Sequence, residues 1–470
     1  MHHKRLIFLF LLLLPLLCHA QETGSLHSKH ASFDGNVLTL SGNVELHHSL
    51  GVLLAEEAIL TKQEPHQDFP FSHISLHKAV ELLFKDRSKL TCERADLDFL
   101  SLKGTLLGER HPIVYSEQLQ VKGEPLSLIM QAVHAELTCA KIFGEKGDLS
   151  YVLTALQGEQ DVHIQYGTQC ELSCNRALYD KSNPAHPLLS AFSKEDLGFC
   201  RFTRGSDVID ATSATLDIQN AILTLQEPRG VLVSSLEKKS NGSFRAHELF
   251  LDHQKHLLTL RGQVVLDEPI FGHLTTNDQL FLKGEEQHRF DFCYAECLGN
   301  TELTYQDPAT GELHHLTCHG KVTMDRSKHV IYFDSPESVE PLSENEQLFY
   351  QGKECHLFAD HAIAEYSAAE GRASLVRIHL KGHIRLRTPE MERTAIADRA
   401  MYSPLTRTLV LSADPGSQVL FHDVKENVQM QAPEVHLIYD PEQNHTVAKG
   451  IGKVRFTLHE EELNQLLHRK

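Results

Sequence analysis

The sequence lacks the short motifs that carry most enzymatic chemistry. Its 470 residues contain no nucleophile elbow, no glycine-rich phosphate loop, no dinucleotide-binding fingerprint and no paired C-x-x-C motifs. The 32 histidines are scattered, which favours solvated surface histidines over metal ligands. Adjacent carboxylates such as Glu56 and Glu57 are better explained as part of a solvent-exposed face than as the catalytic pair of a glycosidase. We therefore expect no catalytic residues, no cofactor and no bound metal.

Positive charge is scarce as well. Lysine and arginine total 45 against 63 aspartates and glutamates, for a net charge of −18. Because binding to nucleic acid depends mainly on lysine and arginine contacts to phosphate, this balance argues against a nucleic-acid partner.

Long apolar runs are absent after the first 20 residues. The run over 6–17 follows Lys4 and Arg5 and precedes the small residues Cys18 and Ala20, which is the layout of a cleaved secretory signal. The run is too short to span a bilayer comfortably. We expect residues 1–20 to be removed and the remaining chain to be exported.

Cysteines are few, and nine of the ten lie beyond residue 20. Two pairs, Cys170 with Cys174 and Cys293 with Cys297, are four residues apart, which is about 13 Å on an extended strand and too far for a disulfide within the pair. Small core cysteines are favoured over a set of disulfides, and the spacing does not define a connectivity.

Helix signals are also scarce, and the exception is the tail over 459–470. There Leu463, Leu466 and Leu467 share a helical face, with acidic residues in the first turn and basic residues in the last. We expect a short amphipathic helix over this segment.

A short pattern recurs along the rest of the chain. Each copy reads apolar, any, small, two of any kind, small or apolar, any, apolar, as in "LLAEEAIL" (53–60) and "AIADRAMY" (395–402). Counting a degenerate copy at 316–323, successive copies start 30 to 42 residues apart. Such a fixed period predicts a repeat architecture.

A second element accompanies several copies of the first. Leucines alternate through a glycine, as in "LTLSGNVEL" (38–46), "LTLRGQVVL" (258–266) and "IHLKGHIRL" (378–386). Strict alternation predicts a strand with one buried face. Each repeat therefore contains two or more strands.

The first element also predicts a corner. Ala55 and Ala58 are an odd number of residues apart, so both face the interior only if the strand has a bulge or corner at Glu56 and Glu57. The glycines of the second element are expected to bend the other strand in the same way. They are Gly42, Gly104, Gly262 and Gly382. Regular corners in successive strands bend a sheet into a trough.

An apolar trough in an exported protein suggests a long apolar ligand. Periodicity by itself favours a different interpretation, in which the interior is packed and dry, as in a structural or adhesive β-solenoid. A further alternative is a polysaccharide-acting enzyme on a β-helix, for which a coil period near 20 to 25 residues and a carboxylate cluster on one face are expected.

The segment "DGNVLTLSGNVELHHSLGVLLAEEAIL" (34–60) resembles the strand pair of OstA-like domains. In that family a G-x-V-x-L strand is followed by G-x-L-x-A-x-x-A, which here are Gly42 to Leu46 and Gly51 to Ala58. The same order recurs over 244–282 and 395–421. These domains occur in lipopolysaccharide-transport proteins of the LptA type and in the periplasmic portion of the LptD type.

The resemblance implies an all-β fold, an open β-jellyroll of repeated strands that is either extended or in two stacked copies, over 21–235 and 236–458. It implies a non-enzymatic carrier or conduit in the periplasm, either free or associated with the outer membrane, whose groove shields acyl chains. The implied partners are lipopolysaccharide or a lipid A-like glycolipid, other β-jellyroll transport components that pair with edge strands, and a second copy of the chain. The residues expected to line the groove are Leu38, Leu40, Val44, Leu46, Leu53, Ala55, Ala58, Leu258, Leu260, Val264, Leu266, Ala397 and Ala400.

Overall fold

The expected all-β class is confirmed. A computed structural model describes residues 25–62, 71–121, 123–143, 149–168, 170–193, 198–233, 241–268, 272–284, 292–307, 311–337, 342–353, 355–369, 372–388, 392–440 and 445–458. These residues form antiparallel strands and contain no helix, so none of them belongs to a helix that could cross a membrane. The signal expected over 1–20 and the helix expected over 459–470 lie outside the described residues.

The chain divides into two compact units. The N-terminal unit extends to Gly198 and includes 217–220, and the C-terminal unit comprises 199–216 and the chain from Ala221 onward. This division is N-terminal to the boundary expected between residues 235 and 236. That boundary falls in the connection between two strands of the C-terminal unit that pair with each other.

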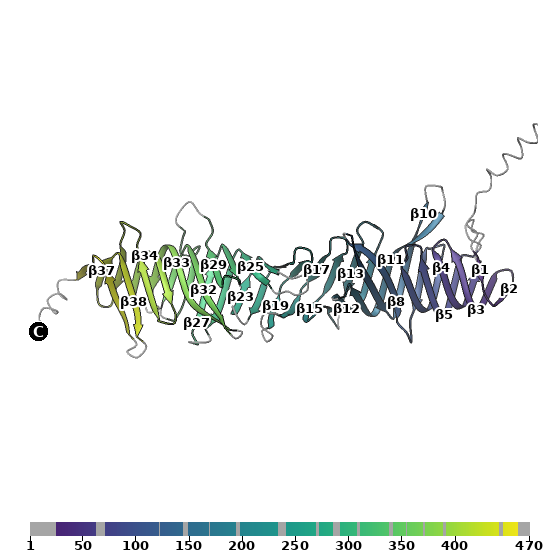
Figure 1. Cartoon of the computed structure of the whole chain (residues 1–470), viewed down its shortest axis with the longest axis horizontal. Helices are drawn as coiled ribbons and strands as arrows, with labels where there is room; N and C mark the ends of the chain where they lie inside the picture. The colour runs from purple at the N-terminus through teal and green to yellow at the C-terminus, as the bar shows by residue number, and fades with distance from the viewer. Residues whose placement is uncertain are drawn as a thin grey trace, which may run out of the picture. The chain divides into compact units, whose positions relative to one another are not determined.

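The N-terminal unit contains thirteen strands that stack in antiparallel order (Figure 1). They are β1 (Leu26–His27), β2 (His30–Phe33), β3 (Val37–His48), β4 (Gly51–Thr61), β5 (His73–Phe84), β6 (Lys89–Asp98), β7 (Lys103–Leu107), β8 (Ile113–Val121), β9 (Glu124–Ala132), β10 (His134–Phe143), β11 (Leu149–Tyr166), β12 (Cys170–Asp180) and β13 (Leu188–Phe192).

Long strands of this unit bend and pass through two halves of one sheet. Half A contains β1, β8 and β9, half B contains β2, β7, β10 and β13, and the bent strands β3, β4, β5, β6, β11 and β12 contribute one segment to each half. The two halves face each other, since the rings of Tyr115 in half A and Tyr179 in half B are 5.9 Å apart.

The C-terminal unit contains the remaining strands. They are β14 (Cys200–Arg204), β15 (Asp207–Ala211), β16 (Ser213–Asp217), β17 (Ile222–Gln226), β18 (Arg229–Val233), β19 (Asn241–Arg245), β20 (Glu248–Asp252), β21 (Leu257–Arg261), β22 (Val264–Glu268), β23 (Gly272–Thr276), β24 (Gln279–Gly284), β25 (Phe292–Leu298), β26 (Thr301–Gln306), β27 (Leu313–Cys318), β28 (Lys321–Asp325), β29 (Val330–Asp334), β30 (Leu348–Gln351), β31 (His356–Ala359), β32 (His361–Ala369), β33 (Arg372–Arg387), β34 (Arg393–Ser403), β35 (Thr408–Ser412), β36 (Val419–Asp423), β37 (Val428–Ala432), β38 (Glu434–Asp440), β39 (His445–Ile451) and β40 (Arg455–Leu458).

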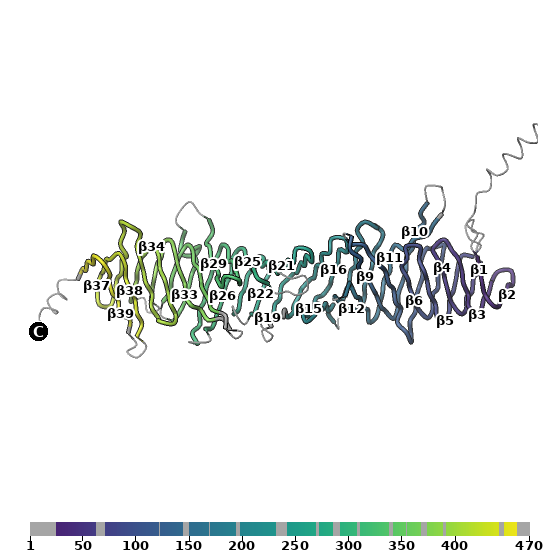
Figure 2. Tube along the Cα trace, viewed as in Figure 1, coloured from purple at the N-terminus to yellow at the C-terminus, as the bar shows by residue number. Residues whose placement is uncertain are grey.

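Pairing in the C-terminal unit follows one rule over most of its length. A strand pairs with the strand next to it in the chain on one side and with the strand three positions away on the other, as in β22 with β23 and β19. The rule again produces two halves. Half A contains β18, β19, β22, β23, β26, β27, β30 and β31, and half B contains β20, β21, β24, β25, β28, β29 and β32. Figure 2 shows the Cα trace, which runs back and forth in successive flattened coils.

The corner predicted at Glu56 and Glu57 is confirmed. The register between β4 and β5 shifts between Leu54 and Glu57, and that between β3 and β4 shifts between Ser41 and Val44. Ala55 and Ala58 flank the shift and are both buried. The small residues of the repeat therefore mark the place where each strand turns from one half into the other.

Three of the four expected glycines lie at such corners. Gly42, Gly262 and Gly382 have φ of 79°, 70° and 79°, and the residue after each also has a positive φ. In each case the glycine carbonyl accepts a hydrogen bond from the backbone N–H of a residue in a neighbouring corner, for example that of Asp360 onto Gly382 at 3.1 Å. These shared features make the three corners equivalent.

Gly104 does not form a corner, contrary to expectation. It lies within β7, where a Cβ atom would be 2.6 Å from Cδ2 of Leu97 and 3.0 Å from Cγ of Leu137. Glycine is needed at this position because two leucines on the flanking strands close over it. The same sequence pattern thus serves a packing purpose here.

Candidate functional site

The residues expected to line the groove lie between the two halves of each unit. Leu38 is partly exposed. The other twelve have exposed fractions of 7% or less, and they are Leu40, Val44, Leu46, Leu53, Ala55, Ala58, Leu258, Leu260, Val264, Leu266, Ala397 and Ala400. The structure therefore gathers these residues within an apolar interior, and that interior is filled by its own side chains.

The two halves are joined at the corners and meet again along the opposite side, which we call the mouth of each unit. At the mouth, the ends of strands distant from their corners come together from both halves. Among the described residues, side-chain contacts rather than strand pairing connect the halves along this side.

Lys181 bridges the mouth of the N-terminal unit. It follows β12 in half B, and its Nζ is 2.7 Å from Glu117 Oε1 and 2.7 Å from Asp86 Oδ2, both of half A. Burial disfavours ionisation of Asp86, but hydrogen bonds from Lys181 and Ser88 outweigh it and lower the pKa of this carboxyl. Glu117 also accepts a hydrogen bond from the hydroxyl of Tyr179 at 2.8 Å. The bridge is thus a partly buried network of charged and phenolic groups.

A second contact crosses the same mouth at the end of β3. The ring of His48 in half A lies 4.4 Å from that of Phe99 and 5.2 Å from that of Tyr151, both of half B. Burial, together with the nearby charge of Lys85, lowers the pKa of His48 to about 4. The backbone N–H of Leu50 donates to His48 Nδ1 at 3.1 Å, which requires that this nitrogen be unprotonated. His48 is therefore neutral at neutral pH.

In the C-terminal unit, the most buried bridge joins Arg326 and Glu268. Arg326 follows β28 in half B, Glu268 ends β22 in half A, and their Nη2 and Oε1 atoms are 2.9 Å apart. The side chains are only 8% and 4% exposed. The guanidinium also lies 4.5 Å from the ring centre of Phe292 and donates to the Phe292 carbonyl.

Two further cations cross this mouth. Arg407, in the turn after β34 in half B, pairs with Glu312 beside half A at 3.1 Å. Arg393, at the end of β34 in half A, pairs with Asp423 at 2.9 Å and donates to the carbonyl of Thr446 in half B at 3.0 Å. Each bridge therefore contains one cation.

Aromatic side chains form a buried polar cluster near the Arg407 bridge. His314 is 1% exposed, and its Nδ1 is 2.8 Å from the hydroxyl of Tyr350. Tyr305 stacks on the other side of the imidazole, and Tyr402 of half B approaches Tyr350. Burial lowers the pKa of His314, against the opposing charges of Asp307 and Glu312. This cluster interrupts the apolar interior with hydrogen-bonding groups.

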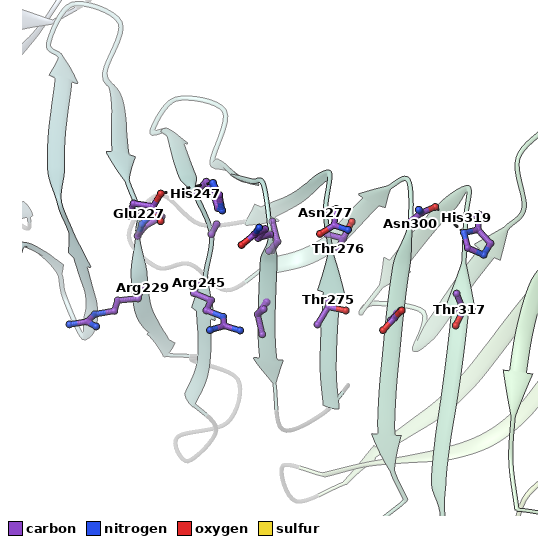
Figure 3. A pocket seen from close by; sticks show the side chains of 16 residues that line it. Glu227, Arg229, Arg245, His247, Thr275, Thr276, Asn277, Asn300, Thr317 and His319 are labelled. Carbon is purple, nitrogen blue, oxygen red and sulfur yellow. Dashed lines mark hydrogen bonds and ion pairs between the residues drawn. The ribbon is translucent and has the colours of Figure 1, made fainter.

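The outer surface of the C-terminal unit carries an open polar groove of about 730 Å³ (Figure 3). Its floor crosses β18, β19, β22, β23, β26 and β27 through a row of paired positions. The groove is lined mainly by charged, amide, hydroxyl and imidazole side chains and by no phenylalanine or tyrosine ring. Val264 is the one expected lining residue that borders it, and its side chain is buried.

The described residues include no group of three or more histidine, cysteine or acidic side chains placed to hold a metal ion. Cys92, Cys297 and Cys318 are buried. Burial raises the pKa of the Cys92 and Cys297 thiols to about 12, which makes them poor nucleophiles. Their placement agrees with the interpretation of these residues as small core residues.

Sequence reasoning missed the residues of the mouth. Lys181, Arg326, Arg393 and Arg407 lie in or beside turns, where no periodicity marks them. One signal was available, because each is a cation next to a strand end in a chain with few cations.

No protein-family model and no curated protein matches this chain.

Proposed function

We propose that this protein is a non-enzymatic periplasmic carrier or conduit with an open β-jellyroll fold of the OstA-like type. Its ligand is the acyl part of lipopolysaccharide or a related glycolipid on its way to the outer membrane. The observation that supports this most is the construction of the sheet. Two apolar faces are held together covalently and by strand pairing on the corner side, whereas in the described part of the chain side-chain ion pairs, hydrogen bonds and ring contacts join them at the mouth.

Acyl chains need such a lining in water. Burying one methylene contributes about 0.8 kcal/mol, so a chain of a dozen carbons is stabilised by roughly 10 kcal/mol in an apolar interior. Twelve of the thirteen expected lining residues are apolar side chains that the ligand-free protein keeps from water. When an acyl chain enters between the halves, these side chains exchange their contacts with one another for equivalent apolar contacts with the acyl chain.

The terminal strands suit pairing with other β-jellyroll proteins. Among the described residues, β2 pairs only with β3 in the N-terminal unit, and β40 pairs only with β37 in the C-terminal unit. Both edges expose large apolar side chains, with Phe33 52% and Phe456 58% exposed. Open edges of this kind accept a strand from another chain, which would continue the lining into a transport partner or a second copy.

Lipid analysis of the exported protein tests the proposal. The protein is purified from cells without detergent, and the bound lipid is extracted and identified by mass spectrometry. We expect acylated glycolipid to copurify in a defined ratio to protein. Protein that is folded and free of lipid in repeated preparations contradicts the carrier function.

A structural or adhesive β-solenoid is the second candidate. The burial of the lining residues favours it, because side chains such as Leu260 are already shielded from water by the protein itself. The lipid analysis separates the two functions, since a permanently packed solenoid copurifies with none.

A further inference from the structure

The bridges at the mouth share a chemical feature that the apolar interior does not explain. Each pairs a lysine or arginine with at least one carboxylate at the mouth, next to the apolar interior. A buried ion pair contributes little net stability compared with apolar packing of the same volume. These cations are therefore better explained by a ligand than by the stability of the fold.

The chemistry of the ligand follows from the two parts of the site, which are the apolar interior and the cation beside it. The interior next to the Arg326 bridge is apolar, with Leu266 and Leu282 at 3% and 0% exposure. Arg326 carries a planar guanidinium, which matches phosphate and carboxylate in shape and charge. An apolar chain with an anionic head group satisfies both parts at once.

We propose that the paired cations of the mouth are the head-group subsite of the trough, with the Arg326 and Glu268 bridge as the clearest case. In the structure the acid holds the cation. When an anionic amphiphile inserts its chain, its phosphate replaces Glu268 on Arg326, and Glu268 turns to water as the mouth opens. This inference rests on the proposed carrier function and adds the charge and place of the head group.

Exchange of partners keeps the cost of opening low. Arg326 retains one anionic partner throughout, and its contact with Phe292 remains available. Glu268 gains hydration, which favours an exposed carboxylate over a buried one. The same exchange applies at Lys181, where two acids share one ammonium group.

The test is a titration of the full exported chain with two amphiphiles of equal chain length, both below their micelle concentrations. Dodecyl phosphate carries an anionic head, and dodecyl maltoside carries a neutral one. The test variant is Arg326→Met with Glu268→Gln, which neutralises both partners and so leaves no unpaired buried charge. The control is Lys321→Met with Glu296→Gln, a pair at 2.8 Å within half B whose side chains are 45% and 22% exposed and which does not cross the mouth.

We expect calorimetry to show tighter binding of dodecyl phosphate than of dodecyl maltoside to the wild type and the control. In the Arg326 variant, we expect one phosphate-selective site to lose about tenfold in affinity, as for a lost charge-assisted hydrogen bond. Equal affinity of the two amphiphiles for the wild type overturns the inference while leaving the carrier function intact. Unchanged selectivity in the variant overturns the assignment to this bridge. Absence of binding by either amphiphile overturns the carrier function as well.

Discussion

His48 makes the stability of the N-terminal unit depend on pH. Its ring is packed between Phe99 and Tyr151 at the mouth, and its Nδ1 accepts the N–H of Leu50. Burial, aided by the charge of Lys85, holds its pKa at about 4 instead of the usual 6.5. The folded state therefore binds this proton less readily than the unfolded state does.

We predict that His48 makes the N-terminal unit less stable in acid. The stabilisation is fully present above pH 6.5 and is lost as pH falls through the window from 6.5 to about 4, by about 3 kcal/mol at most. His48→Asn keeps an acceptor for the Leu50 N–H and does not titrate. Urea unfolding at pH 7 and pH 4.5 is expected to show a smaller loss of stability in the variant. Equal losses in the two proteins contradict the assignment.

The corner is the feature that defines each bent element. In β33 it lies at Gly382 and His383, where two successive residues have positive φ. A Cβ atom on Gly382 would be 2.4 Å from Oδ2 of Asp360, which lies within hydrogen-bonding distance of His383 at 2.6 Å. The carboxyl group of Asp360 also accepts a hydrogen bond from Gln347. The corner thus depends on both backbone freedom and space.

We predict that Gly382→Ala lowers the free energy of unfolding of the C-terminal unit by about 2 to 4 kcal/mol, through backbone strain and the displaced Asp360. Gly416→Ala is the control, since Gly416 also has a positive φ but its Cβ atom would meet nothing within 4 Å. The control is expected to cost about 1 kcal/mol. Denaturant unfolding measures both, and similar losses would show that space at the corner is unimportant.

The elements were largely predictable, and the contacts between them were not. Alternation in "LTLSGNVEL" and the small residues Ala55 and Ala58 identified the strands and the corner, because both signals lie within a few residues of sequence. Gly104 was misassigned because the pattern does not reveal that Leu97 and Leu137 close over it. Arg326 and Glu268 are 58 residues apart and lie in opposite halves of the unit, so no local sequence pattern indicates that they meet.

On the scale of the whole molecule, each unit is a bent sheet whose interior is apolar and whose mouth is held by side chains. The corners join the two halves covalently, and strand pairing resumes on both sides of each register shift. The mouth is held by side chains alone in the described residues, through ion pairs such as those of Lys181 and Arg326 and the ring contacts of His48, and the proposed function requires these contacts to open. A carrier requires both properties in one fold.

Site-specific photo-crosslinking in cells tests this account most directly. A photoreactive amino acid replaces Leu260, which is fully buried between the halves, or its neighbour Arg261, whose side chain is exposed on the outer face. If acyl chains enter the interior, the probe at position 260 captures glycolipid and the probe at position 261 does not. Capture at neither position, or equal capture at both, in folded and exported protein contradicts the account.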